Sequence, residues 1–337
     1  GSGLAGVRME QSVLLVGVVF GIVQGGGSFL ICEKDLSWAA VASRLEDVTV
    51  CVVDQLWVGA GIRQVRASGL QKCGAVPVLC SRWNDCAYVM YTSGTTGQAK
   101  GVRVGRRNLE NYLSWHALEA FSSGHGEVAV LCGTLSFDGN LTVLFWPAMC
   151  CGGKVMTLSR KRLQDLDGVV NAVANAGNCF LKLVPSYAAL LVQRAASMKH
   201  AFGIMLGGEA ATWSLVKLLR LAGVARVWNE YGPTECTVAV SNELANVERQ
   251  QAEFACVGIG RPGKGSWIGV IRGAGWIGGA QVTQGYLEQV QQTRAAFRYD
   301  FGYNDGRSKM YESGDQMQAM LDGKLMYEGR LDDQVKI

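Results

Sequence analysis

The sequence predicts an α/β fold in which helices flank mixed β-sheets, followed by a smaller β-rich subdomain. Two features of the sequence lead to this prediction. Apolar runs of strand length alternate with longer helical stretches up to residue 240, and beyond that point glycine becomes denser while helical periodicity fades. The chain has 337 residues, 49% of them apolar and 18% charged, so it can bury sizeable cores and does not resemble a disordered protein.

Five short aliphatic segments are expected to be buried strands, and five stretches with helical period are expected to be helices. The strands are 48–53, 88–91, 128–131, 180–184 and 203–206. The helices are 109–118, 163–176, 187–198, 214–222 and 287–297. In sheets of this kind ligands bind at the carboxyl ends of the strands, so a functional site is expected there.

Composition excludes several classes of protein. The longest apolar run, Val13 to Val23, contains Gly17 and Gly21 and is too short to cross a bilayer, so we expect a buried helix or strand and no membrane partner. Lys and Arg total 32 against 28 for Asp and Glu, and they are scattered, which argues against nucleic-acid binding. Eleven cysteines without a C-x-x-C pair predict small buried residues in a reducing cytosol rather than disulfides or a zinc site.

A loop rich in glycines and hydroxyl groups directly follows the strand expected at 88–91. From Tyr91 to Gly101 it reads YTSGTTGQAKG. Glycines let backbone amides approach an anion, hydroxyls donate to phosphate oxygens, and Lys100 adds positive charge, so the segment predicts a phosphate-binding loop. No Ser or Thr follows the lysine, so the loop differs from the form in which that hydroxyl binds magnesium. A plain serine and glycine turn is the alternative.

This loop is the first of six motifs that resemble, in order, those of the adenylate-forming superfamily, and most closely the adenylation domains of nonribosomal peptide synthetases. The other five are FD at 137–138, NEYGPTE at 229–235, GYL at 285–287, YESGD at 311–315 and GRLDDQVKI at 329–337. The resemblance implies an adenylate-forming enzyme core with a smaller β-barrel-like subdomain. The expected divisions are an α/β core over 1–240, the β-rich subdomain over 241–331, and a hinge over 332–337, at Asp332, leading to a lid beyond Ile337.

The resemblance also implies a two-step reaction in the cytoplasm. An amino-acid carboxylate attacks the α-phosphorus of ATP to give an aminoacyl-adenylate and pyrophosphate, and the phosphopantetheine thiol of a carrier protein then takes the acyl group. ATP and Mg²⁺ would serve the first step, and the carrier protein and other synthetase domains would be partners. The residues implied for the phosphate chemistry are Thr92, Lys100, Thr234 and Glu235, with Glu235 as the Mg²⁺ ligand.

Further residues are implied for nucleotide binding. They are Ser93, Gly94, Thr95, Thr96, Gly97, Gly208, Glu209, Ala210, Tyr231, Gly232, Asp315 and Arg330. Tyr231 would stack on the adenine, and Asp315 would bind the ribose hydroxyls, for which a carboxylate offers two acceptors. A turn residue after Gly314 is the alternative role for Asp315.

A substrate pocket follows from the same motifs. The residues implied are Phe137, Asp138, Gly139, Thr142, Lys182, Met205, Gly207, Glu230, Val238 and Ala239. Asp138 would pair with the α-ammonium of an amino acid, which selects amino acids over plain carboxylic acids. Its alternative role is to cap a helix that begins near Gly139.

Lys182 and Glu230 indicate which amino acid is bound. Opposite charges buried at one site need each other or a polar ligand, and a carboxamide offers an acceptor to the ammonium and a donor to the carboxylate. The pocket also resembles the family's asparagine pattern, and Gly139 leaves room for a β-substituent. Aspartate, glutamine, and a structural ion pair beneath a pocket for something else are alternatives, as are an acyl-CoA ligase and a nucleotide-binding module without turnover.

Overall fold

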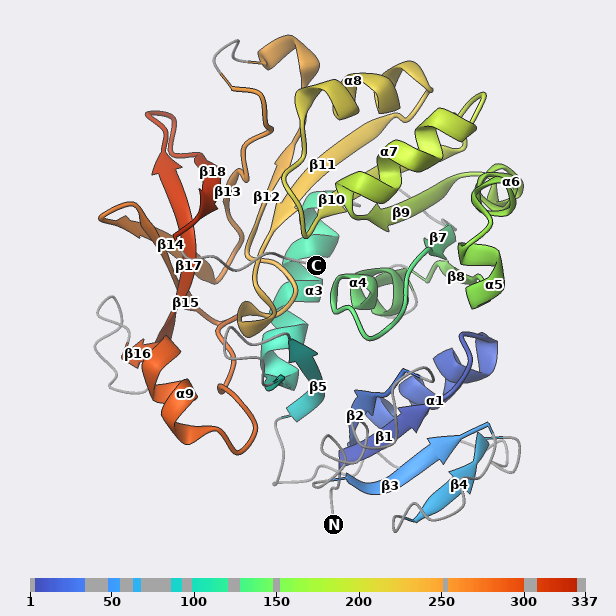
Figure 1. Ribbon diagram of the computed structural model, residues 1–337, viewed down its shortest axis with the longest axis vertical. Coiled ribbons are helices and arrows are strands. Elements are labelled where there is room, and N and C mark those ends of the chain that lie inside the picture. The colour runs from blue at the N-terminus through green and yellow to red at the C-terminus, as the bar shows by residue number, and fades with distance from the viewer. Residues whose placement is uncertain are drawn as a thin grey trace.

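We analysed a computed structural model of the protein, which describes residues 4–33, 48–54, 63–67, 86–92, 99–120, 128–147, 152–250, 254–299 and 308–331. Three β-sheets organise these residues. In Figure 1 the blue N-terminal part lies at the bottom, the green and yellow part at the top, and the orange and red part on the left.

The first sheet contains β1 to β6, in the order β4-β3-β1-β2-β5-β6 among the described residues. Their bounds are Leu4–Arg8, Ser28–Ile31, Val48–Val53, Gln64–Arg66, Cys86–Thr92 and Lys100–Gly105. Only the pairing of β5 with β6 is antiparallel within this part of the chain.

Helix α1, Val13–Gln24, connects the parallel strands β1 and β2. Ser12 caps it, because its side chain accepts a hydrogen bond from the Leu15 amide. The apolar run is therefore a helix, but the expectation that it is buried is wrong for one of its faces. Leu15 lies in the core, whereas Val13 is 76% exposed.

The second sheet contains β7 to β13, in the order β13-β12-β11-β10-β9-β7-β8. Their bounds are Val128–Leu131, Lys154–Thr157, Cys179–Leu183, Ala201–Gly207, Arg226–Tyr231, Ser241–Leu244 and Arg261–Pro262. The strands from β8 to β11 are parallel, and β12 and β13 extend the sheet in antiparallel fashion.

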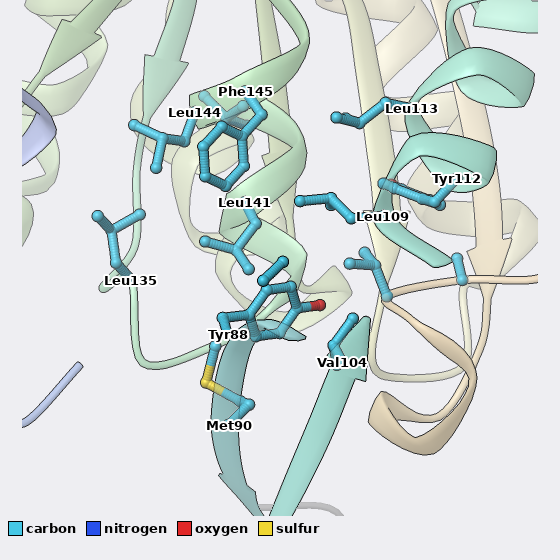
Figure 2. Packing of buried hydrophobic residues seen from close by; sticks show 14 of the residues in the cluster. Tyr88, Met90, Val104, Leu109, Tyr112, Leu113, Leu135, Leu141, Leu144 and Phe145 are labelled. Carbon is cyan, nitrogen blue, oxygen red and sulfur yellow. The ribbon is translucent and has the colours of Figure 1, made fainter. Parts of the chain in front are cut away.

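Helices cover both faces of the second sheet. On one side lie α6, Leu166–Ala176, α7, Pro185–Arg194, and α8, Trp213–Leu221, preceded by the short α5, Arg160–Leu163. On the other side lie α3, Arg106–Ala120, and α4, Gly139–Trp146. Figure 2 shows side chains of α3 and α4 meeting in the core beside Tyr88 and Met90 of β5.

Strand geometry decides which side chains face α3 and α4. Successive residues of a strand point to opposite faces, and Phe180, Met205 and Trp228 pack in the cluster that contains these two helices. Lys182, Gly207 and Glu230 each stand two positions further along the same strands. The alternation therefore turns them toward α3 and α4 as well, at the carboxyl ends of β9, β10 and β11.

The third sheet is antiparallel and branches around the long strand β17. Its strands β14 to β18 span Ser266–Ile271, Ala274–Gly279, Phe297–Tyr299, Lys309–Ala319 and Leu325–Arg330, and α9, Val290–Ala296, precedes β16. The third sheet begins at Ser266, so the predicted boundary at residue 240 falls inside the second sheet. Strands β12 and β13 are short and partly polar, and they lack the apolar run that marks a buried strand.

The predicted elements between residues 86 and 222 correspond to observed ones, with small shifts at their ends. The stretch 163–176 divides into α5 and α6 around Asp165. None of the helices in the described ranges is both long enough and apolar enough to cross a membrane. The cysteines in these ranges are unbridged and buried, except for the half-buried Cys256.

Candidate active site

Two adjoining cavities lie where the carboxyl ends of β9, β10 and β11 approach the third sheet. We call them the central cavity, of about 540 Å³, and the side cavity, of about 340 Å³. The wall between them is formed by residues that line both: Gly208, Glu209, Glu230, Gly232 and Arg330.

Most of the predicted site residues line these cavities. Those in the central cavity are Thr92, Lys100, Phe137, Asp138, Gly139, Lys182, Gly207, Gly208, Glu209, Glu230, Gly232, Thr234, Glu235, Val238 and Arg330. Ala210 and Tyr231 line the side cavity. Thr142, Met205, Ala239 and Asp315 line neither cavity in the part of the chain that is described. Residues 93–97 and Asp332 lie outside the described residues.

An ion pair between Lys182 and Glu230 forms the floor of the central cavity. Strand β10 runs between β9 and β11, and the pairing register sets Gly207 beside Glu230. A β-carbon on Gly207 would lie 3.3 Å from the Glu230 carbonyl oxygen, which is a tight contact, and 3.9 Å from Glu230 Oε2, which is an ordinary one. Both charged side chains are almost fully buried.

Three further side chains close a hydrogen-bond network around the ion pair. The Tyr112 hydroxyl donates to Glu230 Oε1 at 3.0 Å and lies 2.6 Å from Thr142 Oγ1. Because its one hydrogen goes to the carboxylate, the Thr142 hydroxyl donates to Tyr112. Lys182 donates to Thr142 at 3.0 Å and to Tyr112 at 3.3 Å, and His116 Nε2 lies 3.3 Å from Glu230 Oε1.

Glu230 is ionised in this network. Burial by itself would raise its pKa, but the charge of Lys182 and the hydrogen bond from His116 lower the pKa of Glu230 to about 2. The floor therefore presents a paired ammonium and carboxylate.

Sequence reasoning missed Tyr112 and His116, although a signal was present. Leu109, Tyr112, Leu113 and His116 follow the i, i+3, i+4, i+7 spacing of a core-facing helix stripe. Two polar aromatic residues on such a stripe must find partners inside the core, because buried polar atoms are nearly always hydrogen-bonded. Figure 2 shows Tyr112 on α3 beside Leu109 and Leu113.

Asp138 immediately precedes α4 and is only 4% exposed. It makes no helix-capping hydrogen bond, and its Oδ2 has no hydrogen-bond partner within the described residues. Burial raises the pKa of Asp138 to about 6, against the opposing effects of a hydrogen bond with Thr234 and of the charge of Lys182. A buried carboxylate oxygen of this kind, on the wall of a cavity, suits a cationic group of a ligand.

The space beside Gly139 is occupied. A β-carbon at this position would lie 2.5 Å from Cε1 of Phe137. The ring of Phe137 therefore fills the room that the sequence assigned to a substrate β-substituent.

Thr92, Lys100, Thr234 and Glu235 line the same cavity. Glu235 Oε1 accepts a hydrogen bond from the Tyr286 hydroxyl at 2.8 Å, and Lys100 Nζ lies 5.2 Å from the centre of the Tyr286 ring. The single carboxylate of Glu235 fits Mg²⁺, which is commonly held by one or two carboxylates with phosphates and water completing its shell.

Two tyrosine rings form an aromatic wall of the side cavity. Tyr231 and Tyr327 line it, with ring centres 6.3 Å apart and ring planes inclined by 34°. Asn229 braces another wall by donating to the carbonyls of Val257 and Gly258. An aromatic wall of this kind suits a flat aromatic base.

Asp315 lies against the Tyr231 hydroxyl and is fully buried. Its Oδ2 accepts from the Tyr231 hydroxyl at 2.5 Å, and its Oδ1 accepts from Arg330 at 3.0 Å. The register of β17 and β18 places Asp315 opposite Arg330. Arg330, which lines both cavities, thus stands between Asp315 and a ligand.

Comparison with known proteins gives a consistent result. The family described as AMP-binding enzyme matches residues 5–287. Surfactin synthase subunit 2 of Bacillus subtilis (strain 168) is 28% identical over 99% of this chain, and bacitracin synthase 3 of Bacillus licheniformis is 27% identical over 99%. The matches span 10% and 5% of those proteins, so this chain corresponds to a small part of each.

A solved structure matches over the whole chain. The four-domain nonribosomal peptide synthetase holo-AB3403, bound to AMP and glycine, has a TM-score of 0.83 at 26% identity, over 100% of this chain and 26% of that one. The family match contains the floor of the central cavity, whereas Asp315 and Arg330 lie beyond it.

Proposed function

Because this chain belongs to the AMP-binding enzyme family, we propose that it activates an amino acid with ATP, as an adenylation domain of a nonribosomal peptide synthetase, and that the amino acid is L-asparagine or a β-substituted asparagine. The substrate carboxylate attacks the α-phosphorus, an aminoacyl-adenylate forms and pyrophosphate leaves. The phosphopantetheine thiol of a carrier protein then takes the acyl group and AMP leaves. The cytoplasmic setting and the partner synthetase domains remain predictions.

The observation that carries the choice of substrate is the pairing of Lys182 with Glu230 on the floor of a cavity that Asp138 also lines. Asp138 binds the α-ammonium, for which its buried Oδ2 offers an acceptor. The amino-acid side chain then points to the floor. A purely apolar side chain there would leave the remaining acceptor position of Glu230 Oε2 without a donor.

The hydrogen-bond count on the floor favours a carboxamide. In the described structure Glu230 Oε2 accepts only from Lys182, so it can accept one more donor, such as an amide N–H. The three donors of Lys182 are engaged by Glu230, Thr142 and, at the longest distance, Tyr112. The amide oxygen replaces Tyr112 as the third acceptor.

Aspartate and glutamine are the nearest competitors. A second carboxylate beside Glu230 adds like-charge repulsion, which disfavours aspartate. Glutamine differs by one methylene, which a pocket discriminates by only about 1–3 kcal/mol. Because Phe137 fills the space beside Gly139, a β-substituted substrate would need that ring to move.

The nucleotide occupies the side cavity and the phosphate end of the central cavity. Tyr231 stacks on the adenine, while Gly208, Glu209, Ala210 and Gly232 border the base. Thr92, Lys100 and Thr234 neutralise and position the phosphates, to which the loop 93–97 would add backbone amides. Glu235 would hold Mg²⁺, which would supply further charge neutralisation at the phosphates. Arg330 faces the ribose side, where the ribose reaches Asp315 by displacing the Arg330 hydrogen bond, and Asp332 is the hinge.

The experiment is amino-acid-dependent exchange of pyrophosphate into ATP, measured across the amino acids with the protein in its full natural length. We expect the highest rate with L-asparagine, because it satisfies both groups of the floor. A clear preference for leucine or phenylalanine would contradict this substrate.

The variant Glu230→His tests whether Glu230 contacts the substrate side chain. It removes the negative charge that opposes a substrate carboxylate, so the preference should move toward aspartate in the same assay. An unchanged ratio of asparagine to aspartate activity would mean that Glu230 does not contact the substrate.

A further inference from the structure

We propose that Tyr112 and His116 are specificity-determining positioning residues, which act by holding one oxygen of Glu230 away from the substrate and the other toward it. The proposal rests on the proposed function of the same floor. It extends the pocket from the sheet to helix α3, to two positions outside the predicted set.

Both residues are part of the core and are fixed by packing. Tyr112 and His116 are fully buried, one helical turn apart on α3, with ring centres 5.3 Å apart. His116 Nε2 lies 3.0 Å from Met205 Sδ and 3.3 Å from Glu230 Oε1. Because it faces a carboxylate, this nitrogen is assigned the ring hydrogen.

The two residues occupy the same oxygen of Glu230. Oε1 accepts from Tyr112 and lies 3.3 Å from His116 Nε2, so both residues contact this one oxygen. Oε2 accepts from Lys182 and keeps one acceptor position. Glu230 therefore cannot turn without losing the hydrogen bond from Tyr112 and the contact with His116, and the position that remains is the one available to a substrate N–H.

Tyr112 has a second effect, on Lys182. Its oxygen accepts a hydrogen bond from the ammonium at 3.3 Å and thereby competes with a substrate acceptor. Removing this hydroxyl frees one N–H of Lys182, and a substrate carboxylate gains more from a free ammonium donor than a neutral amide does. Substitutions of Tyr112 and of His116 are therefore expected to change the KM values for asparagine and aspartate in different ways.

The experiment measures the KM for asparagine, aspartate and ATP by pyrophosphate exchange with the full natural protein. His116→Leu should raise the KM for asparagine roughly tenfold, the size of losing one hydrogen bond to a charged group, and leave the KM for ATP unchanged. His116→Gln keeps an N–H donor and should recover most of the loss. Tyr112→Phe should instead lower the KM for aspartate and reduce the asparagine preference roughly tenfold.

Matched controls remove the same groups elsewhere. Tyr187→Phe deletes a hydroxyl that donates to the Leu163 carbonyl on the far side of the second sheet, and His200→Gln changes a histidine outside both cavities. Both controls should retain wild-type KM values. Thermal melting of each variant identifies those that fold, and if His116→Leu does not fold, His116→Gln and Tyr112→Phe still decide the question.

Equal changes for all amino acids and ATP, a Gln variant no better than Leu, or an unchanged preference would overturn the proposal. If the wild-type protein prefers an amino acid other than asparagine, the proposed substrate fails separately. The role of α3 is then judged by whether the variants alter the preference for that amino acid over its nearest analogue, and an unaltered preference overturns it.

Discussion

The buried position of Asp138 disfavours its ionised carboxylate, whereas an exposed aspartate is stabilised by water. Its side chain is buried before α4, one oxygen has no partner in the described structure, and burial holds its pKa at about 6 rather than 3.8. A helix-capping hydrogen bond would have satisfied that oxygen, but the Asp138 side chain makes none. The residue is therefore suited to a ligand that brings a positive charge.

The raised pKa predicts how amino-acid binding changes with pH. Below pH 6 the carboxyl becomes protonated and its ion pair with the α-ammonium is lost, so the apparent KM for the amino acid should rise by up to about tenfold per pH unit between pH 6 and 5. The KM for ATP, measured in parallel, serves as the control. A KM for the amino acid that stays flat from pH 7 to 5 would contradict this role of Asp138.

Asp138→Asn separates binding from stability. The ionised wild-type group destabilises the ligand-free fold at pH 7, because a raised pKa means that folding favours the protonated form. The variant should therefore melt no lower than the wild type, while amino-acid-dependent exchange is lost and ATP still binds. A lower melting temperature with lost ATP binding would point to a folding role.

At the scale of elements, three parallel strands deliver the floor of the central cavity. Strands β9 and β11 carry Lys182 and Glu230, and β10 contributes Gly207 between them, so the ion pair depends on the register of all three. Helix α3 then completes it from the facing layer. The pair thus links the sheet to its helical cover.

A double-mutant cycle tests that link. Glu230→Gln leaves the Lys182 ammonium buried without its counter-ion, and Lys182→Met does the same to Glu230, so each should lower the free energy of unfolding by about 3–5 kcal/mol. The double variant should cost at least about 1 kcal/mol less than the sum of the two. Urea unfolding at pH 7 measures all four proteins, and strictly additive losses would contradict a direct pair.

The stabilising effect of Glu230 also has a defined pH window. Because its pKa is lowered from 4.5 to about 2, its contribution is present above pH 4.5 and is lost as the pH falls toward 2.

Strands such as β9 and β10, and the helices near them, could be predicted from sequence because each is a local pattern of apolar residues. Strand β11, which carries Glu230, is not among the predicted strands, because its sequence RVWNEY is largely polar. The alternation within strands also explains why Lys182, Gly207 and Glu230 share one face. The role of Tyr112 and His116 could not be predicted in this way, because it depends on how α3 packs across the sheet. The partners of Asp315 could not be predicted for the same reason, because Arg330 is brought opposite it by the pairing of β17 with β18.

At the scale of the whole molecule, the second and third sheets meet at the cavities. The shared wall takes Gly208, Glu209, Glu230 and Gly232 from the ends of β10 and β11, and Arg330 from β18. A ligand that fills both cavities at once therefore contacts both sheets, whereas an amino acid alone touches mainly one.

This geometry predicts ligand-linked stabilisation. A non-hydrolysable analogue of asparaginyl-adenylate, at about 100 times its Kd, should stabilise the fold by about 2.7 kcal/mol, whereas asparagine or AMP at equal concentration should give less. Thermal melting with each ligand measures the difference. Asp138→Asn should remove most of the gain, and equal stabilisation by the leucyl analogue would contradict the selectivity of the site.

Arg330 is the hydrogen-bond partner of Asp315 in the ligand-free protein, so a nucleotide that binds Asp315 would have to replace it. Its guanidinium neutralises Asp315 while no ribose is bound, so the fold never carries that buried carboxylate uncompensated. If Asp315 binds the ribose as proposed, the incoming ribose takes over at least one of these hydrogen bonds, and the affinity it gains is the difference between two polar contacts rather than the full value of one. On this proposal the small net gain would also let the nucleotide leave easily after each turnover.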